Sequence, residues 1–383
     1  MQAKEDKDKP LKILQLESSN NWGGQEDRLV RESAWLAERG HKILLGCNDT
    51  AAIAGRAGAA GIEVRAIPLR MNIDIAGLKA LASLVRKEKP DIIHAHSSKD
   101  AWFSFWFHQA GIPVVRSRHT TLPPTMPRGR RLIYRHGCRR LIASAGFIAK
   151  TMRDSLGVPP ENIDVVGECV DTKEFCPGDG SAFREEFGIP AGAPLFGLVA
   201  MLRGEKGHAT FLQAARQVVR QRPDARFAIV GGNASDNVVE LLIHEILRSE
   251  FAGLSPSPVI LTGFRRDIPR IMRALDCLVV PSGQEAQTLV IPQAFATAKP
   301  VIASRVGGIP ELVTDGENGL LIPPADPANL AEAMLKIATD PALASRLAAE
   351  GRRFAERELA VDVKMFQLLA SYRKAAAPAT AAA

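Results

Sequence analysis

The chain has 383 residues, which fits two domains of roughly 150–200 residues each better than a single core. Hydrophobic residues make up 46% of it and charged residues 24%, as is typical of soluble globular proteins, and the lack of any run of about 18 apolar residues excludes a membrane-spanning helix. The net charge of +7 fits either an acidic partner or plain solubility.

The cysteines and the two ends of the chain indicate its compartment. Five cysteines are scattered, odd in number and without a CxxC pair, which favours a reducing environment. The first ten residues are charged and lack the apolar core of a secretory signal, and residues 374–383 are of low complexity. We therefore expect a cytoplasmic protein with a disordered C-terminal tail.

In the first half of the chain, short apolar runs alternate with segments of helical length. Residues 11–16 are expected to form a buried strand and residues 23–40 a helix that stops at Gly40. Further strands are expected at 41–47, 62–69, 91–97, 113–119 and 140–145. Such alternation predicts a parallel sheet with helices on both of its faces.

The second half repeats this alternation after a break. Residues 171–194 are rich in Gly, Pro and charge and are expected to form a linker. Strands are then expected at 194–200, 225–232, 259–264, 277–282, 300–308 and 319–324. We predict two Rossmann-like domains, residues 1–172 and 173–360. Residues 361–383 are predicted to form a C-terminal helix that crosses back onto the first domain and ends in the tail.

The loop after the strand at 277–282 has the composition of an anion site. Ligands of open parallel sheets bind at the carboxyl ends of strands. Thr288 is expected to cap a helix, which leaves the N–H groups of Leu289, Val290 and Ile291 without helical partners and ready to bind phosphate. Pro292 is tolerated in the first turn, where its missing N–H costs little.

This loop belongs to a longer pattern that resembles the retaining glycosyltransferases of family 4, also called group 1 transferases. The family signature is similar to PSxxEGFGLVxLEAMAxGxPVIAxxxGGxxExxxxGxxGxL. The positions that match are Pro281, Ser282, Glu285, Leu289, Val290, Ala294, Ala296, residues 300–303, Gly307, Gly308, Glu311, Gly316, Gly319 and Leu320. The resemblance implies an α/β protein of the GT-B fold, in which two Rossmann-like domains with parallel sheets face each other across a cleft.

The resemblance also implies roles for residues of the second half. Glu285 is expected to be catalytic, close to the transferring sugar. Gln293 occupies the family's second acidic position and is expected to hold the donor ribose. Compared with an acid, an amide can still form these hydrogen bonds and loses only their charge-assisted part. Residues 198–212 resemble VGRLxxEKGxxxLL, so Lys206 is expected to hold the donor diphosphate, on which charge builds as the glycosidic bond breaks.

One departure from that second motif concerns a cation. Met201 occupies the position where the family has an arginine, and Arg203 is expected to substitute for it. Together with Gln293, this departure leaves two alternatives to catalytic transfer open. One is a non-catalytic relative that binds sugar nucleotides, and the other is a nucleotide-sugar epimerase of the same fold. A nicotinamide-dependent dehydrogenase is disfavoured because no GxGxxG follows a strand.

Further site residues follow from the same resemblance. Gly23 and Gly24 follow the first strand, as in the family's first-domain glycine loop, and are expected to approach the donor. Gly232 and Phe264 are expected to line the base pocket, with a plain core position as the alternative for Phe264. His119 ends a strand where the family often has a histidine near the transferred sugar; it is expected to be catalytic, with a structural histidine as the alternative.

The implied reaction moves a sugar, with retention, from a UDP-, GDP- or ADP-sugar to a hydroxyl of a glycolipid or saccharide. Such a retaining hexosyltransferase fits bacterial lipopolysaccharide or surface polysaccharide assembly. The first domain is expected to bind the acceptor and the second the nucleotide-sugar. No DxD motif ends a strand and no His/Cys cluster has ligand spacing, so we expect no metal and no other cofactor.

A basic and aromatic region of the first domain suggests a further partner. The aromatic segment 101–109 precedes eight arginines, Arg116, Arg118, Arg128, Arg130, Arg131, Arg135, Arg139 and Arg140. One interpretation is a face that meets anionic lipid on the inner side of the plasma membrane; the other is a core helix followed by a solvated basic loop. No nucleic-acid-binding motif accompanies these residues, so nucleic acid is not expected as a partner.

Overall fold

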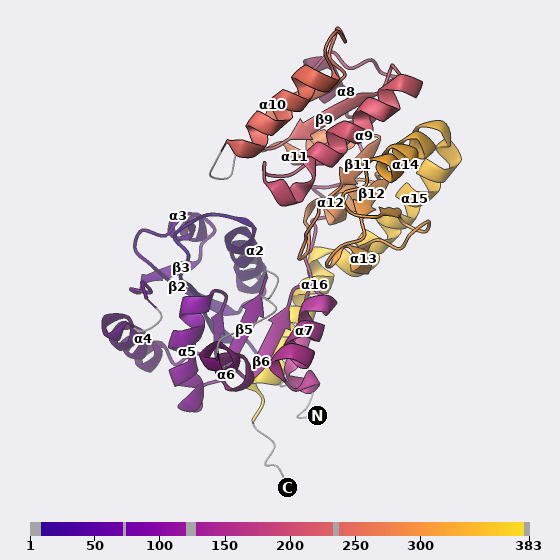
Figure 1. Ribbon diagram of the computed structural model, residues 1–383. Coiled ribbons are helices and arrows are strands. Elements are labelled where there is room, and N and C mark those ends of the chain that lie inside the picture. Colours follow the sequence, from indigo (N-terminus) through magenta and orange to yellow (C-terminus); the bar gives the residue numbers. More distant parts are fainter. Residues whose placement is uncertain (1–8, 72–73, 120–127, 233–236, 379–383) are drawn as a thin grey trace. The chain divides into compact units, whose positions relative to one another are not determined.

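The computed structural model describes residues 9–71, 74–119, 128–232 and 237–378, except for the side chains of Arg128 and Arg130. The chain forms two compact units (Figure 1). One consists of the residues up to Gly167 together with those from Met365 onward, and the other runs from Glu168 to Lys364. Each unit has its own parallel sheet.

In the first unit, the described residues contribute seven parallel strands in the order β3-β2-β1-β4-β5-β6-β7. The strands are β1 Lys12–Glu17, β2 Lys42–Cys47, β3 Glu63–Ala66, β4 Ile92–Ala95, β5 Val114–Arg118, β6 Arg140–Ala143 and β7 Ile163–Val165. The helices are α2 Gly24–Glu38, α3 Ala52–Ala59, α4 Ile75–Glu88, α5 Ser98–Gln109, α6 Arg128–His136 and α7 Gly146–Leu156, with a short 3-10 turn at Pro160–Asn162. The strand order reverses between β1 and β4, which is where open sheets of this kind bind ligands.

In the second unit, six described strands are parallel in the order β10-β9-β8-β11-β12-β13. They are β8 Leu195–Val199, β9 Arg226–Val230, β10 Val259–Gly263, β11 Cys277–Val280, β12 Val301–Ser304 and β13 Leu320–Ile322. The helices are α8 Ser181–Glu186, α9 His208–Gln221, α10 Val238–Glu250, α11 Ile268–Ala274, α12 Val290–Ala296, α13 Ile309–Leu312, α14 Pro327–Thr339 and α15 Pro341–Phe354; helical turns lie at Gly204–Lys206 and Ala355–Leu359. Here the order reverses between β8 and β11.

The start of a helix is often visible in its sequence. Asp326 caps α14 by accepting a hydrogen bond from the Asn329 amide at 3.0 Å, and Asp340 caps α15 through the Leu343 amide at 2.9 Å. A proline follows each aspartate, in the first helical position, where no N–H is needed. The two short helices therefore begin at residues that local chemistry specifies.

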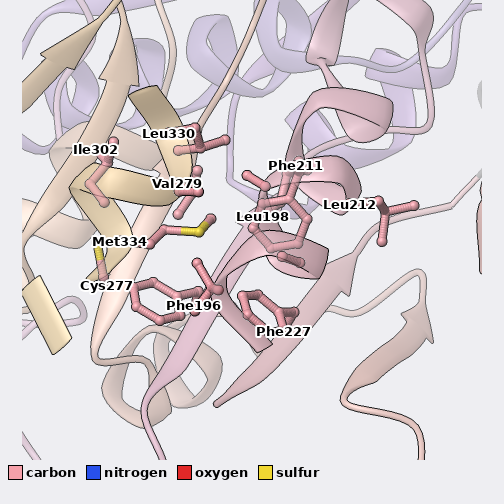
Figure 2. Close-up of a cluster of buried hydrophobic side chains, with 14 of the residues drawn as sticks. Phe196, Leu198, Phe211, Leu212, Phe227, Cys277, Val279, Ile302, Leu330 and Met334 are labelled. Atoms are coloured by element: carbon pink, nitrogen blue, oxygen red, sulfur yellow. The ribbon is translucent and has the colours of Figure 1, made fainter. Parts of the chain in front are cut away.

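The core of the second unit packs sheet residues against helices α9 and α14 (Figure 2). The rings of Phe196 and Phe227, from the neighbouring strands β8 and β9, are stacked with centroids 5.7 Å apart, and Phe211 of α9 meets Phe227 edge-on. Met334 of α14 is fully buried in the same cluster. Burying each such side chain contributes roughly 1.5–3 kcal/mol, so this cluster stabilises the packing of α9 and α14 on the sheet.

The C-terminal helix α16, Val361–Ala376, passes from one unit to the other along the chain. From Met365 onward its residues pack within the first unit. Phe366 meets Trp35 edge-on, and Ser371 and Lys374 bind Asp164 at 2.7 and 2.9 Å. The hydroxyl of Tyr372 lies in the interior of the first unit, where polar side chains of the sheet surround it.

Two details differ from the sequence-based expectation. Residues 168–172 lie in the second unit, because the Val170 N–H donates to the Leu359 carbonyl at 2.9 Å and its side chain is buried in that unit's core. The segment 171–194, expected to be a linker, contains helix α8, whose Phe183 is fully buried. Among the described residues, no helix combines the length and the apolar character needed to cross a membrane.

Candidate functional site

Two loops are joined at the carboxyl edge of the second sheet. One follows β8 and contains Gly207; the other follows β11 and begins at Pro281. Gly207 has φ +74°, and a Cβ added to it would lie 2.0 Å from the Pro281 carbonyl oxygen, so only glycine fits there. The Gly283 N–H also donates to the Glu205 carbonyl at 2.8 Å. These backbone contacts bring the two loops together at the point where the strand order reverses.

The joined loops carry an ion pair. Lys206 Nζ lies 2.6 Å from Glu285 Oε2, and the Ser282 hydroxyl donates to the same oxygen at 3.4 Å. The Glu285 side chain is 9% exposed and that of Lys206 is 23% exposed, so both charges are mostly but not fully removed from water. The structure thus places two of the predicted site residues in direct contact, although they lie 79 positions apart in the chain.

A second glycine fixes the backbone beneath Glu285. Gly307 follows β12, has φ +53°, and would place a Cβ 1.7 Å from the Glu285 carbonyl oxygen. Any side chain at this position would displace the loop that carries the carboxylate. Gly207 and Gly307 therefore hold the segment Pro281–Glu285 from two sides, which explains why glycines occur at these two places in the sequence.

The start of α12 differs from the expectation. Helix α12 begins at Val290, its cap residue is Leu289 in the right-handed helical conformation, and none of the described side chains caps it. Thr288 is buried and precedes the cap, so the prediction that Thr288 caps the helix is wrong: a residue already in helical geometry separates it from the first turn. Pro292 does occupy the first turn, as expected, and the Gln293 N–H makes a helical bond to Leu289 O at 3.1 Å.

The other predicted donor-binding residues of this unit follow the ends of three neighbouring strands. Gly232 lies against Phe264, whose Cβ is 3.1 Å from the place of an added Gly232 Cβ. The Phe264 ring is 72% exposed, so the alternative of a core position for it is excluded. Met201 is 48% exposed, and Arg203 is half exposed with its guanidinium 4.0 Å from the Glu205 carboxylate.

Two glutamines near the loop have different surroundings. Gln293 is half-buried on α12. Gln287, where the family has part of its Gly-Phe-Gly, accepts a hydrogen bond from the Glu168 N–H at 2.5 Å. This contact links the loop to the first residue of the second unit, and no sequence pattern indicates it because it joins positions 119 apart.

In the first unit, a buried carboxylate lies at the end of β1. Glu17 is fully buried, and its carboxylate accepts hydrogen bonds from Ser19 N (2.8 Å), Ser97 Oγ (2.6 Å) and Gln25 Nε2 (2.6 Å). Burial raises the pKa of Glu17, against the opposing effect of these donors. The predicted residues Gly23 and Gly24 open α2 next to Gln25, so Glu17 ties the glycine loop to the start of α5.

His119, the second predicted catalytic residue, follows β5 and meets another histidine. Its Nε2 lies 3.4 Å from His96 Nδ1, and His96 Nε2 lies 2.8 Å from Gln15 Oε1. Burial lowers the pKa of His96 to about 3 and that of His119 well below its usual range. Gln15, His94 and His96 were not predicted as site residues; the one signal for them was that polar residues occur within or next to otherwise apolar strands.

The arginines that suggested a membrane face do not form one set. Arg116 is buried with its guanidinium 4.0 Å from the Tyr134 ring, and Arg140 makes an ion pair with Asp164 at 2.6 Å. Arg131 and Arg135 of α6 are exposed. Residues 120–127 and the side chains of Arg128 and Arg130 lie outside the described part of the chain.

Comparison with known proteins decides the family. Residues 193–340 match the family model described as glycosyl transferases group 1, and residues 22–174 match that of glycosyltransferase family 4. The chain belongs to the group 1, family 4 glycosyltransferases. A D-inositol 3-phosphate glycosyltransferase of Frankia alni is 29% identical to this glycosyltransferase over 325 residues, 76% of each chain.

Solved structures resemble this glycosyltransferase over nearly the whole chain. Anabaena Alr3699/HepE in complex with UDP has a TM-score of 0.83 at 23% identity and covers 94% of this chain and 99% of its own. WaaG, a glycosyltransferase involved in lipopolysaccharide biosynthesis, has a TM-score of 0.66 at 18% identity over 94% and 98% of the two chains. These likenesses confirm the expected fold class, GT-B with two parallel-sheet domains.

Among the described residues of the glycosyltransferase, no group of three or more His, Cys, Asp or Glu side chains is arranged to hold a metal ion. The expectation that the enzyme needs no metal concerns its activity and stays a prediction.

Proposed function

We propose that this glycosyltransferase transfers a sugar from a nucleotide-sugar to an acceptor hydroxyl with retention at the anomeric carbon, as a hexosyltransferase. The observation that carries the proposal is the Lys206–Glu285 pair at the strand-order reversal of the second sheet. Charge develops in opposite directions during this reaction: negative on the departing diphosphate and positive on the sugar. A cation and a carboxylate held side by side match both needs.

In this proposal the ammonium of Lys206 leaves Glu285 when a diphosphate arrives. Lys206 then holds the phosphate oxygens, with Arg203 and the amides of Val290 and Ile291 beside it. Glu285 stays near the sugar, where it steadies positive charge and orients the ring. The exchange of partners avoids a buried carboxylate without a cation in the substrate-free state, which would cost several kcal/mol.

The nucleoside is proposed to lie over the ends of β9 and β10. Gly232 lets the ring approach the backbone, and the exposed Phe264 offers a face to the base. Gln293 on α12 is proposed to bind the ribose hydroxyls. Because HepE is known in complex with UDP and with UDP-glucose, we propose a UDP-sugar as donor ahead of GDP- and ADP-sugars.

The donor proposal is tested with UDP, GDP and ADP as probes. A nucleotide that binds the folded state stabilises it and so raises the melting temperature. At a nucleotide concentration 100 times the dissociation constant, the stabilisation is about 2.7 kcal/mol. We expect binding of UDP, a loss of about tenfold or more in affinity for Lys206→Met, and a smaller loss for the matched variant Arg203→Met. Failure of all three nucleotides to bind in calorimetry would overturn the proposal.

The acceptor is proposed to bind at the carboxyl edge of the first sheet, near Gly24 and His119. We propose a glycolipid or saccharide acceptor, in bacterial lipopolysaccharide or surface polysaccharide assembly, on the grounds that WaaG acts in lipopolysaccharide biosynthesis. The curated relative from Frankia instead acts on D-inositol 3-phosphate, a phosphorylated polyol. Parallel assays with truncated lipopolysaccharide cores and with inositol 3-phosphate separate these two acceptor classes.

We also propose that the first unit binds the anionic inner face of the plasma membrane while the protein stays on the cytoplasmic side. The exposed residues Arg131, Leu132 and Arg135 of α6 support this, together with Trp106 of the contacting helix α5, which is 54% exposed. The protein is expected to sediment with phosphatidylglycerol vesicles and not with phosphatidylcholine vesicles. Salt and the double variant Arg131→Glu/Arg135→Glu should both release it.

Metal-independent catalysis is part of the proposal, because basic side chains and amides are placed to stabilise the leaving diphosphate. Full activity in excess EDTA is expected, and loss of activity that Mg²⁺ or Mn²⁺ restores would contradict it.

Met201 and Gln293 favour one alternative, a relative that binds sugar nucleotides without transferring them. UDP-glucose binding without turnover across the acceptor panel would support that alternative. Product analysis without an acceptor would reveal an epimerase.

A further inference from the structure

Polar side chains beneath the carboxyl edge of the first sheet form one hydrogen-bonded chain. The amide of Gln15, on β1, donates from Nε2 to the Tyr372 hydroxyl at 3.2 Å. Its Oε1 lies 2.8 Å from His96 Nε2. His96 Nδ1 in turn lies 3.4 Å from His119 Nε2, and the two rings are nearly parallel, 11° apart, with centroids separated by 5.7 Å. The large centroid separation places the rings edge to edge, as an N–H···N bond requires.

The chemistry of each group sets the direction of the protons. Gln15 Oε1 can only accept, so His96 must carry its hydrogen on Nε2. The Nδ1 of a neutral His96 then has a lone pair and can only accept, so His119 must donate from Nε2. The remaining ring nitrogen of His119, Nδ1, is therefore without a proton and can act only as an acceptor.

The other end of the chain agrees with this direction. Tyr372 accepts from Gln15 and can donate its own proton to His94 Nδ1 at 2.7 Å. His94 then donates from Nε2 to the Ser117 hydroxyl at 2.8 Å. Gln15, His94 and Tyr372 are fully buried, and burial lowers the pKa of both His94 and His96, so the rings stay neutral and the direction does not depend on an added proton.

His119 Nδ1 is the exception in this network. Among the described residues it has no hydrogen-bond partner, and the atom is screened from water, although the residue as a whole is partly exposed. A histidine with a purely structural role would normally have both nitrogens satisfied, because an unpaired buried polar atom costs about 1–3 kcal/mol. An unpaired acceptor of this kind is expected of a group that accepts a hydrogen bond from a ligand.

We propose that Tyr372, Gln15 and His96 are positioning residues that hold His119 in the Nε2–H tautomer, so that its Nδ1 accepts a hydrogen bond from a hydroxyl of the bound sugar. The contact with sugar rests on the proposed function; the tautomer does not. His119 Nδ1 is covered by other atoms, and a sugar hydroxyl reaches it only when those atoms move. The hydrogen bond therefore forms only as the sugar binds. This series of hydrogen bonds thus connects the C-terminal helix α16 to a residue at the end of β5.

The tautomer is measured directly by ¹⁵N NMR of the full-length protein labelled at histidine, without any ligand. We expect His119 to show a protonated Nε2 and an unprotonated Nδ1, and His96 to show the same pattern. A rotated Gln15 amide would impose the opposite pattern on both rings. A protonated His119 Nδ1 would therefore overturn the proposal, whether or not the enzyme turns out to use nucleotide-sugars.

The chain offers a matched pair of variants, because it contains two tyrosines. Tyr372→Phe removes the hydroxyl that orients Gln15 and keeps the ring. Tyr134→Phe removes a buried hydroxyl that has no hydrogen-bond partner among the described residues. With UDP-glucose as the donor probe, we expect Tyr372→Phe to lower kcat/KM about fivefold, because the hydroxyl acts on His119 only through Gln15, and to mix the two tautomers of His119. Tyr134→Phe should change neither.

A second substitution protects the test against a folding defect. Gln15→Leu removes both contacts of the amide and should give a larger loss of kcat/KM and the same mixed tautomers, while UDP affinity stays unchanged because the second unit is intact. A lower rate with an unaltered His119 tautomer would show that these residues are only structural and would overturn the proposal. If wild-type protein does not turn over UDP-glucose, the proposed donor fails, and the NMR result still decides the role of the network.

Discussion

The carboxyl edges of the two sheets carry opposite chemistry. In the second unit a lysine and a glutamate form an ion pair that remains partly open to water. In the first unit the polar groups are neutral, buried histidines and a carboxylate that three neutral donors hold. Charge is present where a diphosphate is proposed to bind, and neutral acceptors are present where hydroxyls are proposed to bind. The contrast suggests that each unit is adapted to one kind of substrate group.

The two edges are also built differently. In the second unit, glycines let backbone meet backbone: Gly207 lies against Pro281 and Gly307 against Glu285. In the first unit, side chains from four separate elements meet by hydrogen bonds, as Gln15, His96, His119 and Tyr372 do. The first construction tolerates side-chain changes but no added Cβ, whereas the second is sensitive to the loss of a single polar atom. The predictions below test this difference.

The largest effect is expected from Glu285→Ala. Loss of the carboxylate that steadies the transition state should lower kcat about a hundredfold or more, by analogy with the loss of one preorganised electrostatic group. The control is Glu205→Ala. Glu205 lies in the same pair of loops, two residues before Gly207, but its side chain is half exposed. The control should stay within about twofold in the same steady-state assay. Equal activity of the two variants would mean that the ion pair has no catalytic part.

Gly207→Ala should destabilise the second unit by more than about 3 kcal/mol, because the new Cβ would meet the Pro281 carbonyl and the residue would be strained at φ +74°. Gly204→Ala, three residues earlier in the same turn, meets nothing within 4 Å and should change stability by less than about 1 kcal/mol. Urea unfolding followed by circular dichroism compares the pair. If both substitutions cost the same, the close approach of the two loops is not present.

The first unit should be sensitive to acid. Burial lowers the pKa of His94, His96 and His119 in the folded state, so below the unfolded value of about 6.5 the unfolded chain binds more protons. Stability contributed by these residues is fully present above pH 6.5 and is lost as the pH falls, for His96 towards its folded-state pKa of about 3. For His96, the free energy of unfolding should be about 2 kcal/mol lower at pH 5 than at pH 7, and His94 and His119 should act in the same direction.

Thermal unfolding between pH 7.5 and 5 measures this acid sensitivity. Among the described residues of the second unit, His208 is the one histidine whose pKa burial lowers, to about 4, so that unit should lose less stability. A melting temperature of the first unit that is independent of pH over this range would contradict burial of the histidine cluster.

The smallest effect is expected from Gln293→Glu. A carboxylate can accept charge-assisted hydrogen bonds from ribose hydroxyls, so affinity for UDP should stay the same or rise a few fold. The matched variant Gln287→Glu keeps an acceptor for the Glu168 N–H and should leave affinity unchanged. Calorimetry with UDP measures both. A severe loss of affinity for Gln293→Glu would show that Gln293 has been assigned to the wrong part of the donor.

Sequence patterns predicted the architecture well because its causes are local. Apolar runs mark the strands, and the family motifs that contain Gly207 and Gly307 mark loops at the carboxyl edge of the second sheet. The short strand β7, Ile163–Val165, was missed because three residues give no period. The cap of α12 was assigned to Thr288 because threonine is a good cap, but the cap residue is Leu289 and none of the described side chains caps the helix.

The first-unit site was largely invisible in the sequence. His119 was found through a family resemblance, but its partner His96 lies 23 positions away, and the next members of the network, Gln15 and Tyr372, lie 104 and 253 positions away. Side-chain hydrogen bonds over such separations leave no periodic pattern. Glu17 was missed for the same reason: a charged residue at the end of an apolar strand looks like a solvated strand end, and only the three donors around it show otherwise.

The C-terminal helix affects the order in which the two units can fold during synthesis on the ribosome. Tyr372 completes the interior of the first unit, yet it is made after every residue of the second. Domains usually fold as they leave the ribosome, starting from the N-terminus. Here the unit that emerges first lacks the phenol ring of its interior until residue 372 has been made. The later-made half is therefore the one that can finish folding first.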